Sequence, residues 1–424
     1  MFHRLAALSC LPRVPYLPNA ALCFLVMRWR HILGLAALCA AAGELPEQVR
    51  ELSRIRLKMR EHLATLPNYT CLAVVERTQR APNQRTDRHE DTVRIEVAHV
   101  DDRDMMAWPG AVEFRTADPS QLIGYGMFSS GEFFAHLASI FSQAAVIAYN
   151  GPETIGGRKL LRWDYQAAGS LGSEWVITSA GRSAVTGERG SFWSDPTNHE
   201  VLRLDIASDG LPPNFPIRDV RSEIDYARVR IGERDVYLPQ TARVTLTETM
   251  GERRVNTIEF SHCRQYLTHS EIRYADDDRA TEASPTTGVR EIVLPENLRV
   301  TAELAGAIDP SIQVGDPIQA VVTADAVQKK RIVIPKGAVL TGRVRQVELD
   351  SSTTLQRYLL GLEFTDLTYP GYHARFFAHL VRAAGYQTKP AGAPGVAVLV
   401  LASQPFELKN GTVLQWLTED ISRK

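Results

Sequence analysis

The feature that most constrains the fold is a long run, residues 159–274, in which apolar and polar side chains alternate. A period of two puts successive side chains on opposite faces of a strand, so the run predicts many half-buried strands. In one of them Ala242, Val244 and Leu246 share a face, with polar residues between them. Long alternating antiparallel strands suit a curved sheet with one face covered.

Turn-forming dipeptides such as Asp-Pro and Gly-Glu separate the expected strands of this run. Two further strands are expected upstream, on either side of a polar stretch at 80–90 that is interpreted as a hairpin loop. Residues 101–129 show no regular period. The strands predicted for this half of the chain are 69–78, 92–100, 160–167, 174–178, 189–194, 200–206, 222–231, 236–248 and 253–266.

Two segments with helical spacing are the natural cover for this sheet. In residues 45–66 the apolar positions include Leu45, Val49, Met59 and Leu63, and Pro67 follows as a stop signal. The second segment, Ser130 to Asn150, is apolar over a wide arc and should be well buried.

The second helical segment carries Phe133, Phe134, Ile140 and Phe141. A curved sheet covered by apolar helices can enclose a hydrophobic cavity, so these four residues are candidates to line a site for lipid or acyl chains. The alternative is that they fill a dry core, because apolar helix faces usually serve packing.

The composition then changes, which divides the chain. Residues 275–290 hold an acidic trio with Ala, Ser, Thr, Pro and Gly, a pattern typical of a linker. The predicted fold is therefore mainly β (α+β): a helix-covered antiparallel half-barrel over 44–274, and a second, small all-β barrel or sandwich over 291–420. Strands of the second domain are predicted at 298–304, 317–326, 331–334, 339–349, 358–367, 373–383 and 396–401.

The N-terminal segment 1–43 indicates export. After Met27 come Arg28 and Arg30, then an apolar run at 32–42 that ends in small residues. This is the pattern of a secretory signal peptide, and the run is shorter than the roughly 20 residues that span a bilayer. Translation is expected to start at Met27. The mature chain would have no transmembrane helix and would be periplasmic or extracytoplasmic, with outer-membrane association as a further possibility.

Cysteine usage fits this compartment. Three of the five cysteines lie in the segment expected to be removed, which leaves Cys71 and Cys263, both in predicted strands. In an oxidising compartment these two can form a disulfide; two separate buried thiols are the alternative. His262 adjoins Cys263, but neighbouring strand residues point to opposite faces, which disfavours a Cys–His dyad.

Signals of catalysis are weak throughout. There is no Gly-x-Ser-x-Gly nucleophile turn, no His-Glu-x-x-His helix and no cysteine cluster with metal-site spacing. No cofactor, metal or catalytic residue is predicted, so a non-enzymatic protein is expected. The formal charge of −1 and the lack of a basic block exclude the electrostatic pattern of a nucleic-acid binder.

Residues 188–208 read Glu-Arg-Gly-Ser-Phe-Trp-Ser-Asp-Pro-Thr-Asn-His-Glu-Val-Leu-Arg-Leu-Asp-Ile-Ala-Ser. An aromatic-Asp-Pro turn followed by a strand with an Arg resembles the lipoprotein-carrier-like (LolA/LolB-type) half-barrels. The order of an N-terminal helix, a large antiparallel sheet and an internal helix also fits, over about residues 45–274. The resemblance implies a concave apolar face that takes an acyl chain, and no catalytic residues come with it.

A second resemblance covers residues 294–345. Val-Gly-Asp-Pro-Ile-Gln-Ala-Val-Val at 314–322 and Ile-Val-Ile-Pro-Lys-Gly-Ala-Val-Leu-Thr-Gly-Arg-Val at 332–344 look like the β-barrel domain of TrbI-type scaffolds of conjugation and type IV secretion. The inner-membrane helix with a proline-rich arm and the helical insertion of those scaffolds are missing, which favours a soluble module of similar fold.

The function expected from the sequence is that of an exported envelope protein. Its first domain would bind lipid or lipoprotein acyl chains, and its second would present a surface to other envelope proteins. Two alternatives stay open: an assembly module of a secretion-like envelope complex, and a hydrolase whose residues converge only in space.

Overall fold

The structure is a computed structural model. The expected signal peptide, the start at Met27 and nearly all of the expected linker lie outside its described residues. The boundary expected between the two domains lies outside them as well. The described residues are 45–101, 103–111, 114, 119, 122–129, 135–141, 145–168, 175–266, 290–350, 357–390, 393–402 and 406–420.

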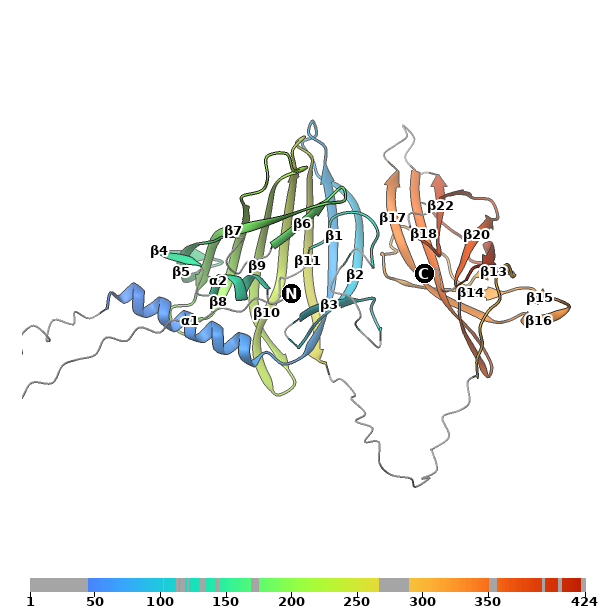
Figure 1. The fold of residues 1–424 in the computed structure, drawn as a ribbon, viewed down its shortest axis with the longest axis horizontal. Coiled ribbons are helices and arrows are strands. Elements are labelled where there is room, and N and C mark those ends of the chain that lie inside the picture. The colour runs from blue at the N-terminus through green and yellow to red at the C-terminus, as the bar shows by residue number, and fades with distance from the viewer. Residues whose placement is uncertain are drawn as a thin grey trace, which may run out of the picture. The chain divides into compact units, whose positions relative to one another are not determined.

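The first half of the described chain forms an 11-stranded sheet that curls into a half-barrel (Figure 1). Its strand order is β3-β2-β1-β11-β10-β9-β8-β7-β5-β4, with β6 paired to β7, and all its pairs are antiparallel. The curved antiparallel sheet predicted from the alternation is confirmed. Its strands are β1 Tyr69–Arg80, β2 Arg88–Val100, β3 Arg103–Ala107, β4 Val146–Ile155, β5 Arg158–Ala167, β6 Trp175–Ser179, β7 Arg182–Ser194, β8 Val201–Asp209, β9 Ile217–Ile231, β10 Arg234–Glu248 and β11 Arg253–Gln265.

The alternation in sequence becomes alternation in burial. On β9, Val220, Ser222, Ile224 and Tyr226 are buried, and Arg221, Glu223 and Asp225 between them are exposed. The inward-facing side chains meet the helices, and the largest fully buried ones include Trp163 and Phe192. Apolar burial on this face, at about 25 cal/mol per Å², is the main force that holds the curved sheet and its cover together.

Helix α1, Glu47–Thr65, confirms the first predicted helix. Its buried apolar residues are Ile55 and Met59, whereas Leu45 and Val49 are 61% and 45% exposed. The buried stripe is therefore shorter than the sequence pattern suggests. His199 Nδ1 lies 2.7 Å from Glu51 Oε1, which ties the helix to the turn before β8.

The second predicted helix, Ser130 to Asn150, is wrong in extent. Among the described residues, helix α2 covers Ala135–Phe141, and the residues from Val146 onward form strand β4, which pairs with β5. A short apolar run does not distinguish a buried helix from a strand. Val146–Tyr149 pair with β5 along the sheet edge, which gives their backbone groups hydrogen-bond partners, and this tertiary contact decides the outcome.

Among the described residues, neither helix combines the length and the apolar character that crossing a membrane requires.

The C-terminal half forms a second, 10-stranded sheet with the main order β12-β19-β18-β17-β14-β13-β23-β20 and a separate two-stranded hairpin, β15–β16. Its core centres on Trp416, which is fully buried and packs edge-on against Phe364 and Phe376. The strands are β12 Arg290–Glu291, β13 Arg299–Leu304, β14 Pro317–Val322, β15 Ala326–Gln328, β16 Arg331–Ile334, β17 Val339–Asp350, β18 Arg357–Tyr369, β19 Tyr372–Arg375, β20 Ala378–Ala383, β21 Gln387–Lys389, β22 Val396–Ala402 and β23 Val413–Thr418.

Two strands predicted here as single units are each divided in the structure. The 317–326 run breaks after Val322, because β14 pairs within the sheet while Ala326 begins the hairpin. The 373–383 run breaks at Phe376 and Phe377, where the chain leaves β18 to pair with β23. Strand β23 was not among the predicted strands.

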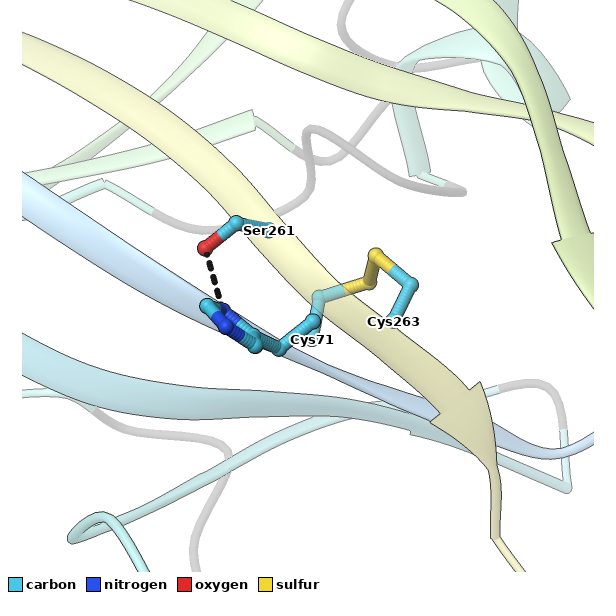
Figure 2. The surroundings of a disulfide bond; sticks show 4 residues. Cys71, Ser261 and Cys263 are labelled. Atoms are coloured by element: carbon cyan, nitrogen blue, oxygen red, sulfur yellow. Dashed lines mark hydrogen bonds between the residues drawn. A yellow bond between two sulfur atoms is a disulfide. The ribbon is translucent and has the colours of Figure 1, made fainter.

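The predicted disulfide is present. Cys71 on β1 and Cys263 on β11 are bonded, with their Cα atoms 4.1 Å apart (Figure 2). The pairing register shifts between Thr70 and Leu72, so Cys71 faces an extra residue on β11, as in a β-bulge. His262 takes the positive φ of 51° at this bulge. The bond therefore joins the first and last strands of the half-barrel.

Candidate functional site

The strongest candidate site is the concave face of β1, β2 and β11. Alternation puts Val75 of β1, Ile95 and Val97 of β2, and Ile258 and Phe260 of β11 on this face, and all five are buried. β1 pairs with both other strands, so these side chains form one continuous apolar surface.

An irregular segment covers part of this surface, where a helix or a second sheet would be the usual cover. We call residues 122–129 the strap. Its carbonyl groups, once buried, need donors because unpaired buried backbone groups are costly. The sheet supplies them: Arg77 Nη1 donates to Tyr125 O at 2.9 Å, and Asn256 Nδ2 donates to Met127 O at 2.9 Å.

A buried ion pair holds the middle of the strap. Arg77 on β1 and Asp91 on β2 are register partners, and each side chain is only 1% exposed. Arg77 Nε and Nη2 donate to the two carboxylate oxygens of Asp91 at 2.6 and 2.5 Å. The guanidinium also lies against two strap rings, 4.5 Å from the centroid of Tyr125 and 4.7 Å from that of Phe128. Such a bidentate, ring-flanked pair fixes geometry tightly.

The phenol of Tyr125 completes this contact by donating to Asp91 Oδ2 at 2.5 Å. Burial, and then the charge of Asp91, raise the pKa of Tyr125 well above its ordinary value of 10. The phenol therefore keeps its proton and remains a donor. We call Arg77, Asp91 and Tyr125 the latch.

Gly126 lets the strap approach the latch. It has a φ of +77°, and a Cβ there would lie 2.1 Å from Arg77 Nη1. Any side chain would thus be strained in its backbone and would collide with the guanidinium.

Beneath the strap lies a small apolar cavity of about 20 Å³, room for about one water molecule. Ser129 Oγ, at the cavity, is buried and has no hydrogen-bond partner among the described residues. Pockets that hold small molecules are usually about 300–1,000 Å³, so the strap would have to move to admit a ligand. The cavity is lined by Ala73, Val75, Ile95, Val97, Met106, Phe128, Ser129, Asn256, Ile258 and Phe260.

A second cavity, of about 10 Å³, lies along α1 and includes His62, Lys58, Glu200 and Tyr226 among its lining residues. Burial lowers the pKa of His62 from 6.5 to about 4, and the nearby charge of Lys58 adds to this. His62 is therefore neutral at physiological pH. Burial raises the pKa of Glu200, while the charge of Lys58 acts in the opposite direction.

Two of the four aromatic and aliphatic residues predicted to line a lipid site, Phe133 and Phe134, lie outside the described residues. Ile140 and Phe141 are on α2, with exposed fractions of 0% and 6%, and the ring of Phe141 meets that of Phe192 at 5.1 Å. Neither lines the two cavities above. Their packing agrees with the dry-core alternative, and a role in ligand binding stays a prediction.

Sequence reasoning missed the latch, although one signal was available. The alternation of β1 places Arg77 on the same inward face as Ala73 and Val75. A charge at an inward position needs a buried partner. Asp91 was not assigned to a strand, because it lies between the expected hairpin loop and the expected strand. In the structure β2 begins at Arg88, four residues before the predicted start, and so includes Asp91.

Among the described residues, the cysteines of this half are paired and no metal cluster is found. The disulfide occupies the sulfurs of Cys71 and Cys263, so neither is a nucleophile beside His262. In the part of the chain that the structure describes, no group of three or more His, Cys, Asp or Glu side chains could hold a metal ion.

Fold and site together define a helix-covered antiparallel half-barrel with an apolar concave face under a latched strap. No family model matches the sequence, and comparison with curated proteins finds no match.

Solved structures similar in fold include one described as an outer membrane lipoprotein-sorting protein domain from Vibrio parahaemolyticus. It is 10% identical, with a TM-score of 0.27, and the match covers 51% of this chain and 93% of that one. Another is a DUF1329 family protein from Desulfovibrio piger, 14% identical with a TM-score of 0.26, covering 51% of this chain and 92% of that one. Because both scores are below 0.5, neither likeness says what this chain binds. The TrbI-type resemblance of the C-terminal half stays a prediction.

Proposed function

We propose that this chain is an exported, non-enzymatic envelope protein whose half-barrel binds an acyl chain of a lipid or lipoprotein between the strap and the concave face. The proposed compartment is the periplasm or another extracytoplasmic space. The C-terminal sheet is proposed to contact other envelope proteins.

One observation carries the proposal: the apolar inner face of β1, β2 and β11 is covered by a short irregular strap, which is fixed by a few polar contacts and by its buried Ile123 and Met127. A packed helix would be held by a broad apolar face, whose removal is costly. The polar bonds that hold the strap come from Arg77, Asp91 and Asn256, and they can exchange with water when it lifts. Only a short apolar contact, mainly Ile123 and Met127, would leave the core at the same time. Lifting it would expose a continuous apolar surface suited to hydrocarbon.

The disulfide supports the same proposal. A half-barrel that opens and closes around a ligand needs a fixed frame. The bond between Cys71 and Cys263 joins β1 to β11, two of the three strands that lie under the strap. The strap can therefore move while the register of the strands beneath it is retained.

The test is native mass spectrometry of the chain purified from a periplasm without detergent, followed by titration with a fluorescent fatty acid. We expect a co-purifying mass that proves to be lipid, and saturable binding of the probe. A bare protein that also fails to bind the probe would contradict the proposal.

Two variants locate the site. Ala73→Val fills the cavity beneath the strap with two methyl groups and should reduce probe binding at least tenfold, since Ala73 is 1% exposed and lines that cavity. Val74→Ile is the matched control, because Val74 is the next residue of β1 and points to the opposite face. Equal loss in both variants would mean that the probe binds elsewhere.

A further inference from the structure

The β15–β16 hairpin, residues 326–334, is separate from both large sheets and extends away from the other C-terminal strands in Figure 1. Its base is anchored, since Ala326 is 3% exposed and Ile334 is fully buried. Gln328 Nε2 also donates to Glu296 O at 3.0 Å. The hairpin is thus a fixed projection whose tip is free to meet another surface.

The tip is strongly basic. Lys329, Lys330 and Arg331 follow one another there and are exposed, and Lys336 lies just beyond β16. None of the four has an ion-pair partner within the described part of the chain. Asp325 is the one acidic residue between 323 and 337, and its Oδ1 accepts a hydrogen bond from the backbone of Lys336. In the first sheet, in contrast, Arg77, Arg203 and Arg254 each lie within ion-pair distance of a carboxylate.

The turn gives no structural reason for this charge. Gln328 pairs with Arg331, so Lys329 and Lys330 form a two-residue turn, with φ angles of 50° and 64°. Such a turn requires the left-handed conformation at both positions, for which Asn-Gly is the favoured pair and lysine is unfavourable. Two lysines here cost stability and supply only charge.

An apolar pair adjoins the charged tip. Val327 and Ile332 face each other across the hairpin and are 54% and 59% exposed, although both are β-branched residues suited to burial. Exposed aliphatic side chains beside lysines form the pattern of peripheral membrane contact, in which apolar groups enter the interface and cations pair with headgroups.

We infer that the β15–β16 hairpin docks the protein onto an anionic phospholipid surface. Lys329, Lys330 and Arg331 contact the lipid phosphates, while Val327 and Ile332 enter the headgroup–acyl boundary. This membrane contact goes beyond the proposed acyl-chain binding and does not depend on it, since it uses only residues of the C-terminal half.

The test is flotation of the purified chain with phosphatidylethanolamine vesicles that contain or lack phosphatidylglycerol. Lys329→Asn with Lys330→Gly removes two charges and installs the favoured turn pair, so the variant keeps its hairpin. Since each lysine near an anionic surface strengthens binding by about a factor of five, the double variant should bind about thirtyfold more weakly. A higher salt concentration should also weaken the binding of the wild type to these vesicles, because salt screens the attraction between charges.

Arg85→Gln with Lys159→Gln is the charge-matched control, because both residues are exposed and lie in the half-barrel. It should float like the wild type. Val327→Thr with Ile332→Thr keeps strand propensity and removes the apolar pair, and it should also bind less. The inference is overturned if phosphatidylglycerol does not increase the binding of the wild type to vesicles, or if the Asn-Gly variant binds as well as the wild type. Fatty-acid binding by the Asn-Gly variant should be unchanged, which separates this test from that of the proposed function.

Discussion

Removing the carboxylate of the latch tests the view that the strap is held by a buried charge pair. In Asp91→Asn the side chain keeps its shape but loses its charge and one acceptor. Arg77 Nε and Nη2 then face a neutral amide, and the phenol of Tyr125 loses its charged acceptor.

The expected loss is large because both partners are 1% exposed. Breaking a buried ion pair from one side costs about 3–5 kcal/mol, since the remaining charge stays buried without compensation. The retained bond from Arg77 to Tyr125 O and the two flanking rings offset part of this. We therefore expect about 3 kcal/mol, a large share of the roughly 5–15 kcal/mol by which domains are stable.

The assay is urea unfolding followed by tryptophan fluorescence. The double variant Arg77→Met with Asp91→Leu replaces both charges with apolar groups and should recover most of the loss. Both variants loosen the strap, so both should bind the fluorescent fatty acid more readily than the wild type. A loss below about 1 kcal/mol in Asp91→Asn, or a double variant as unstable as the single one, would refute the reasoning.

The remaining predictions concern the strap, the disulfide and α1. Gly126→Ala should destabilise the protein by about 2–3 kcal/mol in the same urea assay, because the added Cβ collides with Arg77 at a positive φ; an unchanged midpoint would contradict the close approach. Cys71→Ser with Cys263→Ser should lower stability by about 2–5 kcal/mol, because the bond closes a loop across a sequence separation of 192 residues; a non-reducing peptide map with both thiols free would sink the assignment. His62 has a folded-state pKa of about 4 against 6.5 unfolded, so the unfolded state binds more protons between these values. The contribution of neutral His62 to the free energy of unfolding is complete above pH 6.5 and is lost as the pH falls toward 4. His62→Gln should abolish up to about 3 kcal/mol of this pH dependence, and superimposable stability–pH curves would argue against a neutral, buried His62.

Local sequence pattern alone specified much of the half-barrel that Figure 1 draws. Alternation with a period of two predicted nine of the eleven strands of the half-barrel, because one face of each strand is buried and the other is solvated. Strands β3 and β4 were not predicted, and β7 begins seven residues before its predicted start. β9 and β10 show this most clearly. The sequence also determined helix α1 through its 3.6-residue period and Pro67. It predicted the disulfide, because only Cys71 and Cys263 lie beyond the expected signal peptide, but two separate buried thiols stayed open until the structure placed the two strands side by side.

Tertiary structure alone decided the rest. Val146–Asn150 became part of β4, because an apolar run is helix or strand according to the partner that satisfies its backbone. The strap has no periodic signal, since its conformation depends on contacts with Arg77 and Asn256, far away in the sequence. The latch arises because strand register places Arg77 opposite Asp91, and register is a property of the paired strands, which neither strand possesses alone.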